Sequence, residues 1–202
     1  MFDRSVLEAP SVEVAPLLLG SELVCGPVRV RITEVEAYLG IGEDPGSHSF
    51  RGRTNRNAVM FDEPGHLYVY FTYGMHVCAN IVCSPVGESS AVLIRAGEVT
   101  EGLDLARERR TTSKTDADLA RGPARLTVAL GIALSDNGDD LESGRVRLEL
   151  ASGIPPSFDN GPRTGVSGAG GSDDYPWRFW LPGEPSVSPY KKAAPKKRRL
   201  IV

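Results

Sequence analysis

The sequence predicts an α+β fold in a single compact domain. Segments that alternate apolar and polar residues pair into hairpins, and only a few segments have a helical period. The regular alternation of strand and helix that characterises parallel α/β folds does not occur in the sequence. With 202 residues, of which 41% are hydrophobic and 24% charged, the chain is long enough for one domain with an ordinary core.

The elements are expected in a defined order along the chain. Helices are predicted at residues 14–19, ending at Gly20, at 101–110, capped by Thr100, and at 126–132, after the break at Gly122 and Pro123. Strands are predicted from residue 28 onward and at 66–73, 75–83, 91–96, 145–150 and 177–181, with Gly74 near a hairpin turn and another turn at Asn137 and Gly138.

Two glutamates continue the first of these strands. Val28, Val30 and Ile32 share one face, and the same parity places Glu34 and Glu36 on that apolar face. A carboxylate at the inner end of a strand is costly unless it is paired, and such groups are candidates for catalysis. The alternative for Glu36 is an ordinary ion pair with Arg29, Arg31 or Arg95.

A long loop is predicted to follow, from residue 38 to residue 65. It is rich in Gly, Pro, Ser and Asn, and it contains His48. Arg51, Arg53 and Arg56 also lie in it, without an acidic residue between positions 50 and 61. Long ordered loops are usually functional, so these arginines are candidates for contact with a polyanion.

Aromatic residues concentrate in the same region. Seven of the 14 lie between positions 38 and 73, and on the predicted strand Tyr68 and Tyr70 face one way while Phe71 and Tyr73 face the other. A half-buried strand explains such a pattern as well. With Tyr38 and His48 nearby, the rings would instead form a slot for a planar heterocycle, as in enzymes that extrude a nucleobase.

Several classes of protein and site are disfavoured. The three histidines lack the spacing of a zinc protease, no phosphate-binding glycine loop occurs, and the three cysteines contain no C-x-x-C pair. We therefore expect no metal and no cofactor. The sequence has no signal peptide and no apolar run that could cross a membrane, so we expect a cytoplasmic protein. We also expect the protein to be a monomer.

The charge is distributed unevenly. The net charge is −3, but residues 191–202 hold six basic groups and no acidic one. The first 190 residues therefore carry 17 basic and 26 acidic groups. We expect a domain at residues 1–190 and a basic, mobile tail at 191–202 that could add non-specific attraction to phosphates.

Six segments together resemble a known family, the alkyladenine or 3-methyladenine DNA glycosylases. They occur in the order of that family and span most of the chain: EVEAYLG (34–40), RNAVMF (56–61), PGHLYVYFTYGMHVCANIVC (64–83), AVLIRA (91–96), ARGPARL (120–126) and PWRFWLPG (176–183). The resemblance implies a compact α+β domain with a curved, mostly antiparallel sheet, flanking helices and a protruding β-hairpin. It also implies base-excision repair, in which the bond between an alkylated or deaminated purine and deoxyribose is hydrolysed in duplex DNA.

The resemblance also implies roles for individual residues. Glu36 is similar to the general base that activates the attacking water, and Arg95 to the arginine that helps to hold this water. Residues that resemble the lining of the base pocket are Tyr38, His48, Tyr70 and Asn80, of which Asn80 disfavours guanine. Tyr73 resembles the wedge that fills the vacated stack, with Met75 beside it at the DNA.

The chemistry expected of this set agrees with its residue types. A carboxylate stabilises the positive charge that develops on the sugar and accepts a proton from water. Lys114 is the only lysine before the tail, so we expect water as the nucleophile, without a Schiff base or strand cleavage. Two alternatives remain open: a nucleic-acid-binding module without activity, and a hydrolase that acts on free nucleosides.

Overall fold

The computed structural model describes residues 2–72, 74–153 and 156–193. Within these ranges the helices are α1 (Ser11–Leu17), α2 (Leu103–Arg109) and α3 (Pro123–Leu130), with short 3-10 turns η1 (Arg4–Leu7), η2 (Ala58–Phe61), η3 (Asp116–Asp118), η4 (Leu134–Asp136) and η5 (Ala169–Gly171). The strands are β1 (Glu22–Cys25), β2 (Val28–Tyr38), β3 (Leu67–Thr72), β4 (His76–Val82), β5 (Ala91–Glu101), β6 (Val146–Glu149), β7 (Asp159–Gly161) and β8 (Arg178–Trp180).

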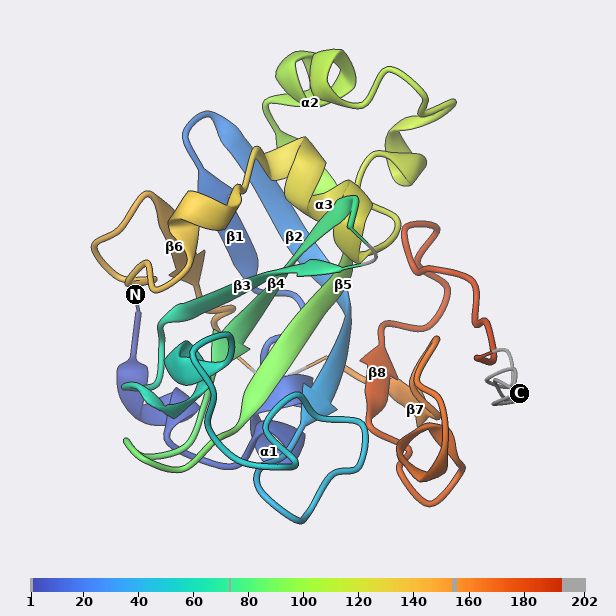
Figure 1. The fold of residues 1–202 in the computed structure, drawn as a ribbon. Coiled ribbons are helices and arrows are strands. Elements are labelled where there is room, and N and C mark those ends of the chain that lie inside the picture. Colours follow the sequence, from blue (N-terminus) through green and yellow to red (C-terminus); the bar gives the residue numbers. More distant parts are fainter. Residues whose placement is uncertain (1, 73, 154–155, 194–202) are drawn as a thin grey trace, which may run out of the picture.

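These strands form one curled antiparallel sheet (Figure 1). Its main path runs β3-β4-β5-β2-β1-β6, and β8 joins the free side of β2 and pairs with β7. The long strand β2 is central, because it pairs with β5 along one side and with β1 and then β8 along the other. The predicted α+β class and single domain are confirmed. The mobility of the tail stays a prediction, and residues 194–202 lie outside the described part of the chain.

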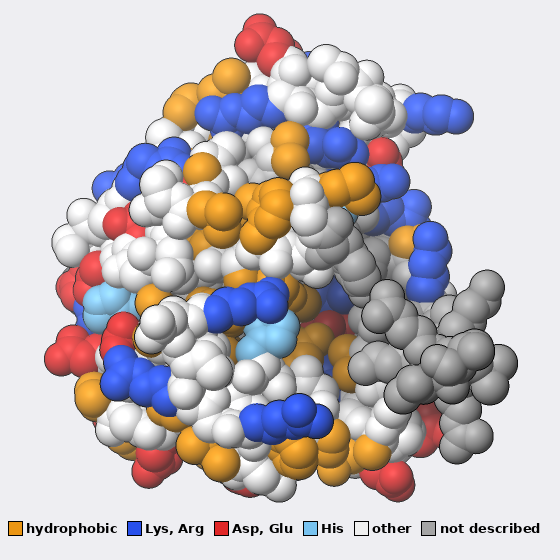
Figure 2. All heavy atoms as spheres, in the orientation of Figure 1, with side chains coloured by type: hydrophobic (Ala, Val, Ile, Leu, Met, Phe, Trp, Pro, Cys, Tyr) orange, Lys and Arg blue, Asp and Glu red, His pale blue; other side chains and the backbone are white. Residues whose placement is uncertain are grey.

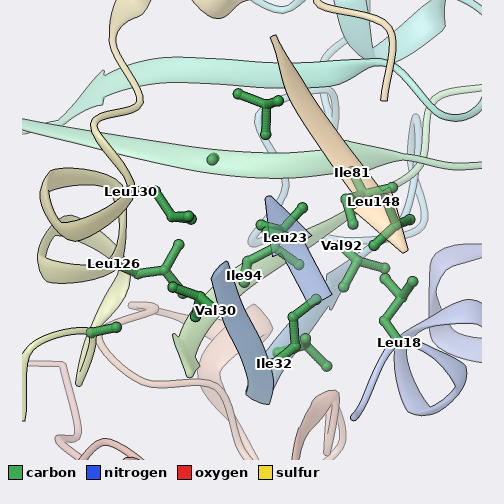
Figure 3. Close-up of a cluster of buried hydrophobic side chains, with 14 of the residues drawn as sticks. Leu18, Leu23, Val30, Ile32, Ile81, Val92, Ile94, Leu126, Leu130 and Leu148 are labelled. Carbon is green, nitrogen blue, oxygen red and sulfur yellow. The ribbon is translucent and has the colours of Figure 1, made fainter. Parts of the chain in front are cut away.

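One face of the sheet packs against helices to form the core. In Figure 3, Leu126 and Leu130 of α3 point toward Val30 and Ile94, which come from β2 and β5. All four side chains are fully buried. Burial of such a side chain contributes about 1.5–3 kcal/mol each, so this layer supplies much of the stability of the fold.

The parity prediction for β2 is wrong beyond Ile32. The pairing of β2 with β5 shifts register between Ile32 and Glu34, and again between Glu34 and Val35. As a result Val35 and Ala37 join the core, and Glu34 and Glu36 point to the opposite face. A strict period of two cannot anticipate such a bulge. The two glutamates are buried as expected, but they lie away from the hydrophobic core.

The predicted hairpin is confirmed as β3 and β4. Gly74 has a φ of +67° at the turn, a conformation that glycine adopts without strain. Phe71 and Met75 near the tip are exposed, so this end of the hairpin presents apolar side chains to solvent. Tyr73 lies outside the described residues.

Several element boundaries differ from the prediction. The strand expected at residues 91–96 continues to Glu101, and Thr100 lies within it, where its hydroxyl donates a hydrogen bond of 2.8 Å to Glu22. Helix α2 therefore begins later, after Gly102, and Thr100 does not cap it. Pro123 is the first residue of α3 rather than a break before it, because the first turn of a helix needs no amide donor there. The short strand β1 is absent from the prediction.

Candidate active site

A cavity of about 550 Å³ lies on the face of the sheet opposite the core. Alternate residues of four neighbouring strands line it, since side chains along a strand alternate between its two faces. They are Tyr68, Tyr70 and Thr72 of β3, Cys78 and Asn80 of β4, Leu93 and Arg95 of β5, and Glu36 and Tyr38 of β2. Loop residues, including His48 and Thr164, complete the wall. Figure 2 shows the hollow at the centre of this face, with a histidine and basic side chains at its rim.

Glu36 lies in the wall of this cavity and is fully buried within the protein. Its Oε1 accepts a hydrogen bond of 2.6 Å from the amide of Thr164 and lies 3.3 Å from the guanidinium of Arg95. Its Oε2 accepts a bond of 2.8 Å from the hydroxyl of Tyr38. A carboxylate has about four acceptor positions, so these three donors leave one for a further group.

A second buried carboxylate orients Arg95. Glu34 accepts a hydrogen bond of 2.9 Å from Arg95 Nε and one of 2.6 Å from Arg178 Nε. The amide of Ser188 donates to it at 2.7 Å. Burial opposes the charge of Arg95, but Glu36 and Glu34 outweigh this effect and raise the pKa of Arg95 above its ordinary value. Arg95 therefore stays cationic between the two glutamates.

The ion pairs considered for Glu36 are thus partly present. Arg95 contacts it, as one alternative required. Arg29 instead pairs with Glu22, Glu101 and Glu149, and Arg31 with Glu98 and Glu184, all on other parts of the surface. Both Glu36 and Arg95 line the cavity, so their ion pair is part of the candidate site.

Tyr38 is positioned from behind by a buried ion pair. Arg163 and Asp44 are both inaccessible to solvent, and two bonds of 2.6 Å join the guanidinium to the carboxylate. The guanidinium lies 4.4 Å from the centre of the Tyr38 ring. Burial, then the charge of Glu36, raises the pKa of Tyr38 well above its usual value. The phenol therefore remains a proton donor to Glu36.

Tyr68, Tyr70 and His48 form an aromatic wall of the cavity. The rings of Tyr68 and Tyr70 are stacked with centres 5.5 Å apart, and His48 meets Tyr70 edge-on at 4.6 Å. His48 Nδ1 shares a hydrogen bond of 3.0 Å with the Tyr68 hydroxyl. Burial, with a smaller effect of Arg56, lowers the pKa of His48, and burial raises that of Tyr68 to about 12. The wall is therefore neutral near pH 7 and presents rings and hydroxyls.

Asn80 is a polar group within the otherwise aromatic part of the cavity. It is buried, and its Nδ2 donates a hydrogen bond of 3.0 Å to the carbonyl of Tyr68 in the paired strand. This contact fixes the amide, so that the remaining polar capacity of the side chain is presented in a defined orientation.

The arginines predicted to contact DNA lie outside the cavity and are exposed. Arg56 donates a hydrogen bond of 3.2 Å to the carbonyl of Phe71 and lies over the Tyr70 ring, which connects the loop to the hairpin. Arg53 lies 3.8 Å from Asp62, so an acidic neighbour is present just beyond the interval considered in the sequence. Met75 is 70% exposed near the hairpin tip.

Sequence reasoning missed the groups that support the site. The pair of Asp44 and Arg163 joins positions 119 residues apart, and nothing in a single sequence links them. Thr164 acts through its backbone amide, which carries no sequence signal. Arg178 was identifiable only as part of the motif PWRFWLPG.

Metal ligation and membrane insertion have specific structural requirements. Among residues 2–72, 74–153 and 156–193, the His, Cys, Asp and Glu side chains form no cluster of three suited to a metal ion. Within the same ranges, every helix falls short of the length and apolar character that a membrane crossing requires.

Comparison with known proteins agrees with this geometry. Residues 5–185 match the model of the family described as methylpurine-DNA glycosylase. A protein of Leifsonia xyli subsp. xyli is 61% identical over 94% of this chain and 92% of its own length. One of Streptomyces avermitilis is 52% identical, with coverages of 97% and 94%, and one of Mycobacterium leprae is 45% identical, with coverages of 90% and 86%. All three carry the name "Putative 3-methyladenine DNA glycosylase". The chain therefore belongs to the methylpurine-DNA glycosylase family and is a hydrolase of the DNA glycosylase type.

Proposed function

We propose that this enzyme hydrolyses the N-glycosidic bond of alkylated or deaminated purines in duplex DNA. The substrates include 3-methyladenine and 7-methylguanine, and they extend to neutral lesions such as hypoxanthine or ethenoadenine. The damaged nucleotide leaves the helix and enters the cavity, and water attacks its C1′ atom. The observation that carries the proposal is a carboxylate, Glu36, held by three donors in the wall of an open cavity lined with aromatic rings.

Glu36 acts as the general base in this mechanism. Its unused acceptor position takes a proton from the attacking water, and its charge stabilises the positive charge that develops on the sugar. General-base assistance of this kind contributes about 10²–10⁴-fold to the rate. Arg95, held by Glu34, keeps the carboxylate in position and helps to bind the water.

The aromatic wall accounts for the recognition of the base. A cationic purine such as 3-methyladenine gains from contact with the faces of Tyr38 and Tyr70. A neutral lesion must be protonated as it leaves. Asn80 disfavours unmodified guanine in this proposal, because the 2-amino group would meet its amide. 7-Methylguanine carries the same amino group, and it is excised because its cationic base leaves more readily.

The nucleophile is water rather than a side-chain amine. No lysine lines the described part of the cavity, so a Schiff base cannot form there. The product is an abasic site with an intact DNA backbone. The exposed tip of the β3–β4 hairpin, with Met75, enters the minor groove and helps to keep the base extrahelical.

Replacement of Glu36 tests its proposed role as the general base. Glu36→Gln should lower single-turnover release of 3-methyladenine from methylated duplex DNA by at least about 100-fold and preserve lesion binding, because the amide cannot accept the proton. Excision is measured by alkali cleavage of abasic sites. Glu98→Gln removes an exposed carboxylate outside the cavity and serves as the matched control.

The results also separate the two alternative functions. Full activity of Glu36→Gln would remove the proposed mechanism. Salt-sensitive binding by the wild-type protein without any abasic product would favour a silent binding module. Release of bases from free nucleosides, but not from DNA, would favour a nucleoside hydrolase.

A further inference from the structure

Four buried charges of alternating sign lie in a row beside the cavity. They are Glu34 and Glu36 of β2, Arg95 of β5 and Arg178 of β8, and each is at most 7% exposed. Both arginines donate through Nε to Oε1 of Glu34, Arg178 at 2.6 Å and Arg95 at 2.9 Å. Arg95 also lies 3.3 Å from Glu36. The charge row therefore runs from Arg178 through Glu34 and Arg95 to Glu36, and its positive and negative charges balance.

Arg178 lies at the end of the charge row that is away from the cavity. Glu36 and Arg95 line the cavity, whereas its described lining includes neither Glu34 nor Arg178. Arg178 is fixed in place, because its Nη2 donates a hydrogen bond of 2.8 Å to the carbonyl of Ser188. The amide of Ser188 in turn donates to Glu34 at 2.7 Å. Any effect of Arg178 on the reaction must therefore pass through Glu34 and Arg95.

Arg178 determines how the charge of Arg95 is shared. Without Arg178, Arg95 alone would face two buried carboxylates, which is one positive charge against two negative ones. A buried charge without a partner is costly, and uptake of a proton by a carboxylate relieves this cost. Glu34 and Glu36 interact through Arg95, so they would share that proton. A proton on Glu36 removes the proposed base, and a proton on Glu34 weakens the contact that orients Arg95.

The other titratable groups near Glu36 do not supply the balancing charge. They are Tyr38 of β2, Tyr70 of β3, Cys78 of β4 and the ion pair of Arg163 with Asp44. Burial raises the pKa of both phenols and of the thiol, so these three groups are neutral near pH 7. The charge of Arg163 is already compensated by Asp44. Among the described residues, Arg178 is thus the group that balances Glu34.

We propose that Arg178 is a positioning residue for base excision. It compensates the charge of Glu34, so that the charge of Arg95 remains available to Glu36 and to the attacking water. Arg178 itself touches neither the substrate nor this water. The inference rests on the proposed function, because it takes Glu36 as the general base.

The pH dependence of excision tests this role. Single-turnover release of 3-methyladenine from methylated duplex DNA is measured at saturating enzyme for the wild type and for Arg178→Gln. This base is already cationic, so the acid limb of the profile reports the enzyme. Glu36 must be ionised to accept the proton, so the rate rises with pH through the apparent pKa of the two glutamates.

Loss of the positive charge raises this apparent pKa. The acid limb of Arg178→Gln should therefore move up by at least about one pH unit. Its rate should fall at least about ten-fold on the acid side of the limb and recover as the pH rises. Circular dichroism at each pH checks that the variant is folded.

Two further variants separate charge balance from support of the fold. Arg178→Lys keeps the charge, and the midpoint of its acid limb should match that of the wild type. Glu34→Gln/Arg178→Gln removes one negative and one positive charge, which leaves Arg95 paired with Glu36 alone. The midpoint of this double variant should return to the wild-type value, even where its rate is lower. Should Arg178→Gln fail to fold, these two variants carry the test.

Arg121→Gln is the matched control. Arg121 donates a hydrogen bond of 2.8 Å to the carbonyl of Val187, next to Ser188, so its loss disturbs the same C-terminal segment but leaves the charge row intact. The midpoint of this control should stay unchanged. A uniform loss at every pH in Arg178→Gln, an equal shift in Arg121→Gln, or a raised midpoint in the double variant would overturn the role of Arg178.

The same assay separates this proposal from the proposed function. A wild-type protein that releases no base from methylated duplex would refute the glycosylase mechanism itself. Excision by the wild type that Glu36→Gln abolishes, together with an unmoved midpoint in Arg178→Gln, would refute the role of Arg178 alone.

Discussion

At the scale of single residues, the amide and the hydroxyl of Thr164 contribute differently to the active site. Its amide donates to Glu36, whereas its buried hydroxyl has no hydrogen-bond partner among the described residues. Thr164→Val keeps the amide and removes the unpaired hydroxyl at nearly constant shape. Because an unsatisfied buried polar group costs about 1–3 kcal/mol, the variant should be about 1 kcal/mol more stable.

Urea unfolding measures this difference, and the excision assay checks that Glu36 keeps its donor. A matched Ser186→Ala variant removes a hydroxyl that is paired with Thr33, so it should lose stability. A Thr164→Val variant that loses both stability and excision would show that the hydroxyl contacts water or substrate.

Individual site residues were the part of the structure that the sequence predicted best. The residue types of Glu36, Tyr38 and His48 indicated a base-recognising site, and the resemblance to the glycosylase family added Asn80 and Arg95. The structure brings all five to one cavity. The reason given for the burial of Glu36 was wrong, because the register shift at Glu34 reverses the faces of β2. Such a shift depends on pairing with a strand about 60 residues away, which local periodicity does not contain.

At the scale of elements, the loop after β2 is held by one buried charge pair. Besides Arg163, Asp44 accepts hydrogen bonds from the amides of Leu39 and Gly46. Asp44→Asn would leave the buried guanidinium without its counter-charge. Loss of one partner of a buried ion pair typically costs about 3–5 kcal/mol, so we expect a loss of that size.

The same variant should lower kcat/KM for excision, since Tyr38 and His48 depend on this loop for their placement. Thermal unfolding and steady-state kinetics provide the two measurements. Asp116→Asn removes the same type of charge from an exposed pair with Arg107 and should leave Tm and excision unchanged. Equal effects of the two substitutions would contradict a special role for the buried pair.

Elements with strong local signals were predicted well, and those without were not. The β3–β4 hairpin combines alternating apolar residues with Gly74 at a position of positive φ, so its existence and turn followed from the sequence. The strand β1 has only four residues and is defined by its pairing with β2 and β6. The cap assigned to Thr100 failed for a related reason, since β5 extends to Glu101 through long-range pairing that overrides the local capping signal.

At the scale of the whole molecule, the sheet divides two tasks between its faces. The helix-covered face holds the fully buried apolar core, and the opposite face holds the cavity and the charged network. Basic side chains line the upper right edge of the face shown in Figure 2, although the molecule as a whole carries a net charge of −3. Because neighbouring residues of one strand point to opposite faces, substitutions at adjacent positions should affect either the free energy of unfolding or the excision rate.

Leu93 and Ile94 of β5 allow this separation to be measured. Ile94 is fully buried in the core, whereas Leu93 lines the cavity and pairs with Glu36 on one side and Asn80 on the other. Ile94→Ala should lower the free energy of unfolding by about 2–5 kcal/mol, because it leaves a void in a packed layer. Its single-turnover excision rate should stay near the wild-type value at temperatures where the variant is folded.

Leu93→Ala should give the reverse pattern. The truncated side chain borders space that is already open, so the cost in stability should be smaller than for Ile94→Ala. The flipped purine would lose a wall beside Glu36, and a misplaced reacting atom can cost about 100-fold in rate. Urea titration and single-turnover excision on the same preparations give both quantities. Equal losses of stability and rate in the two variants would mean that the two faces of the sheet are energetically coupled. The shape of the cavity would then depend on the packing of the core as well as on the residues that line it.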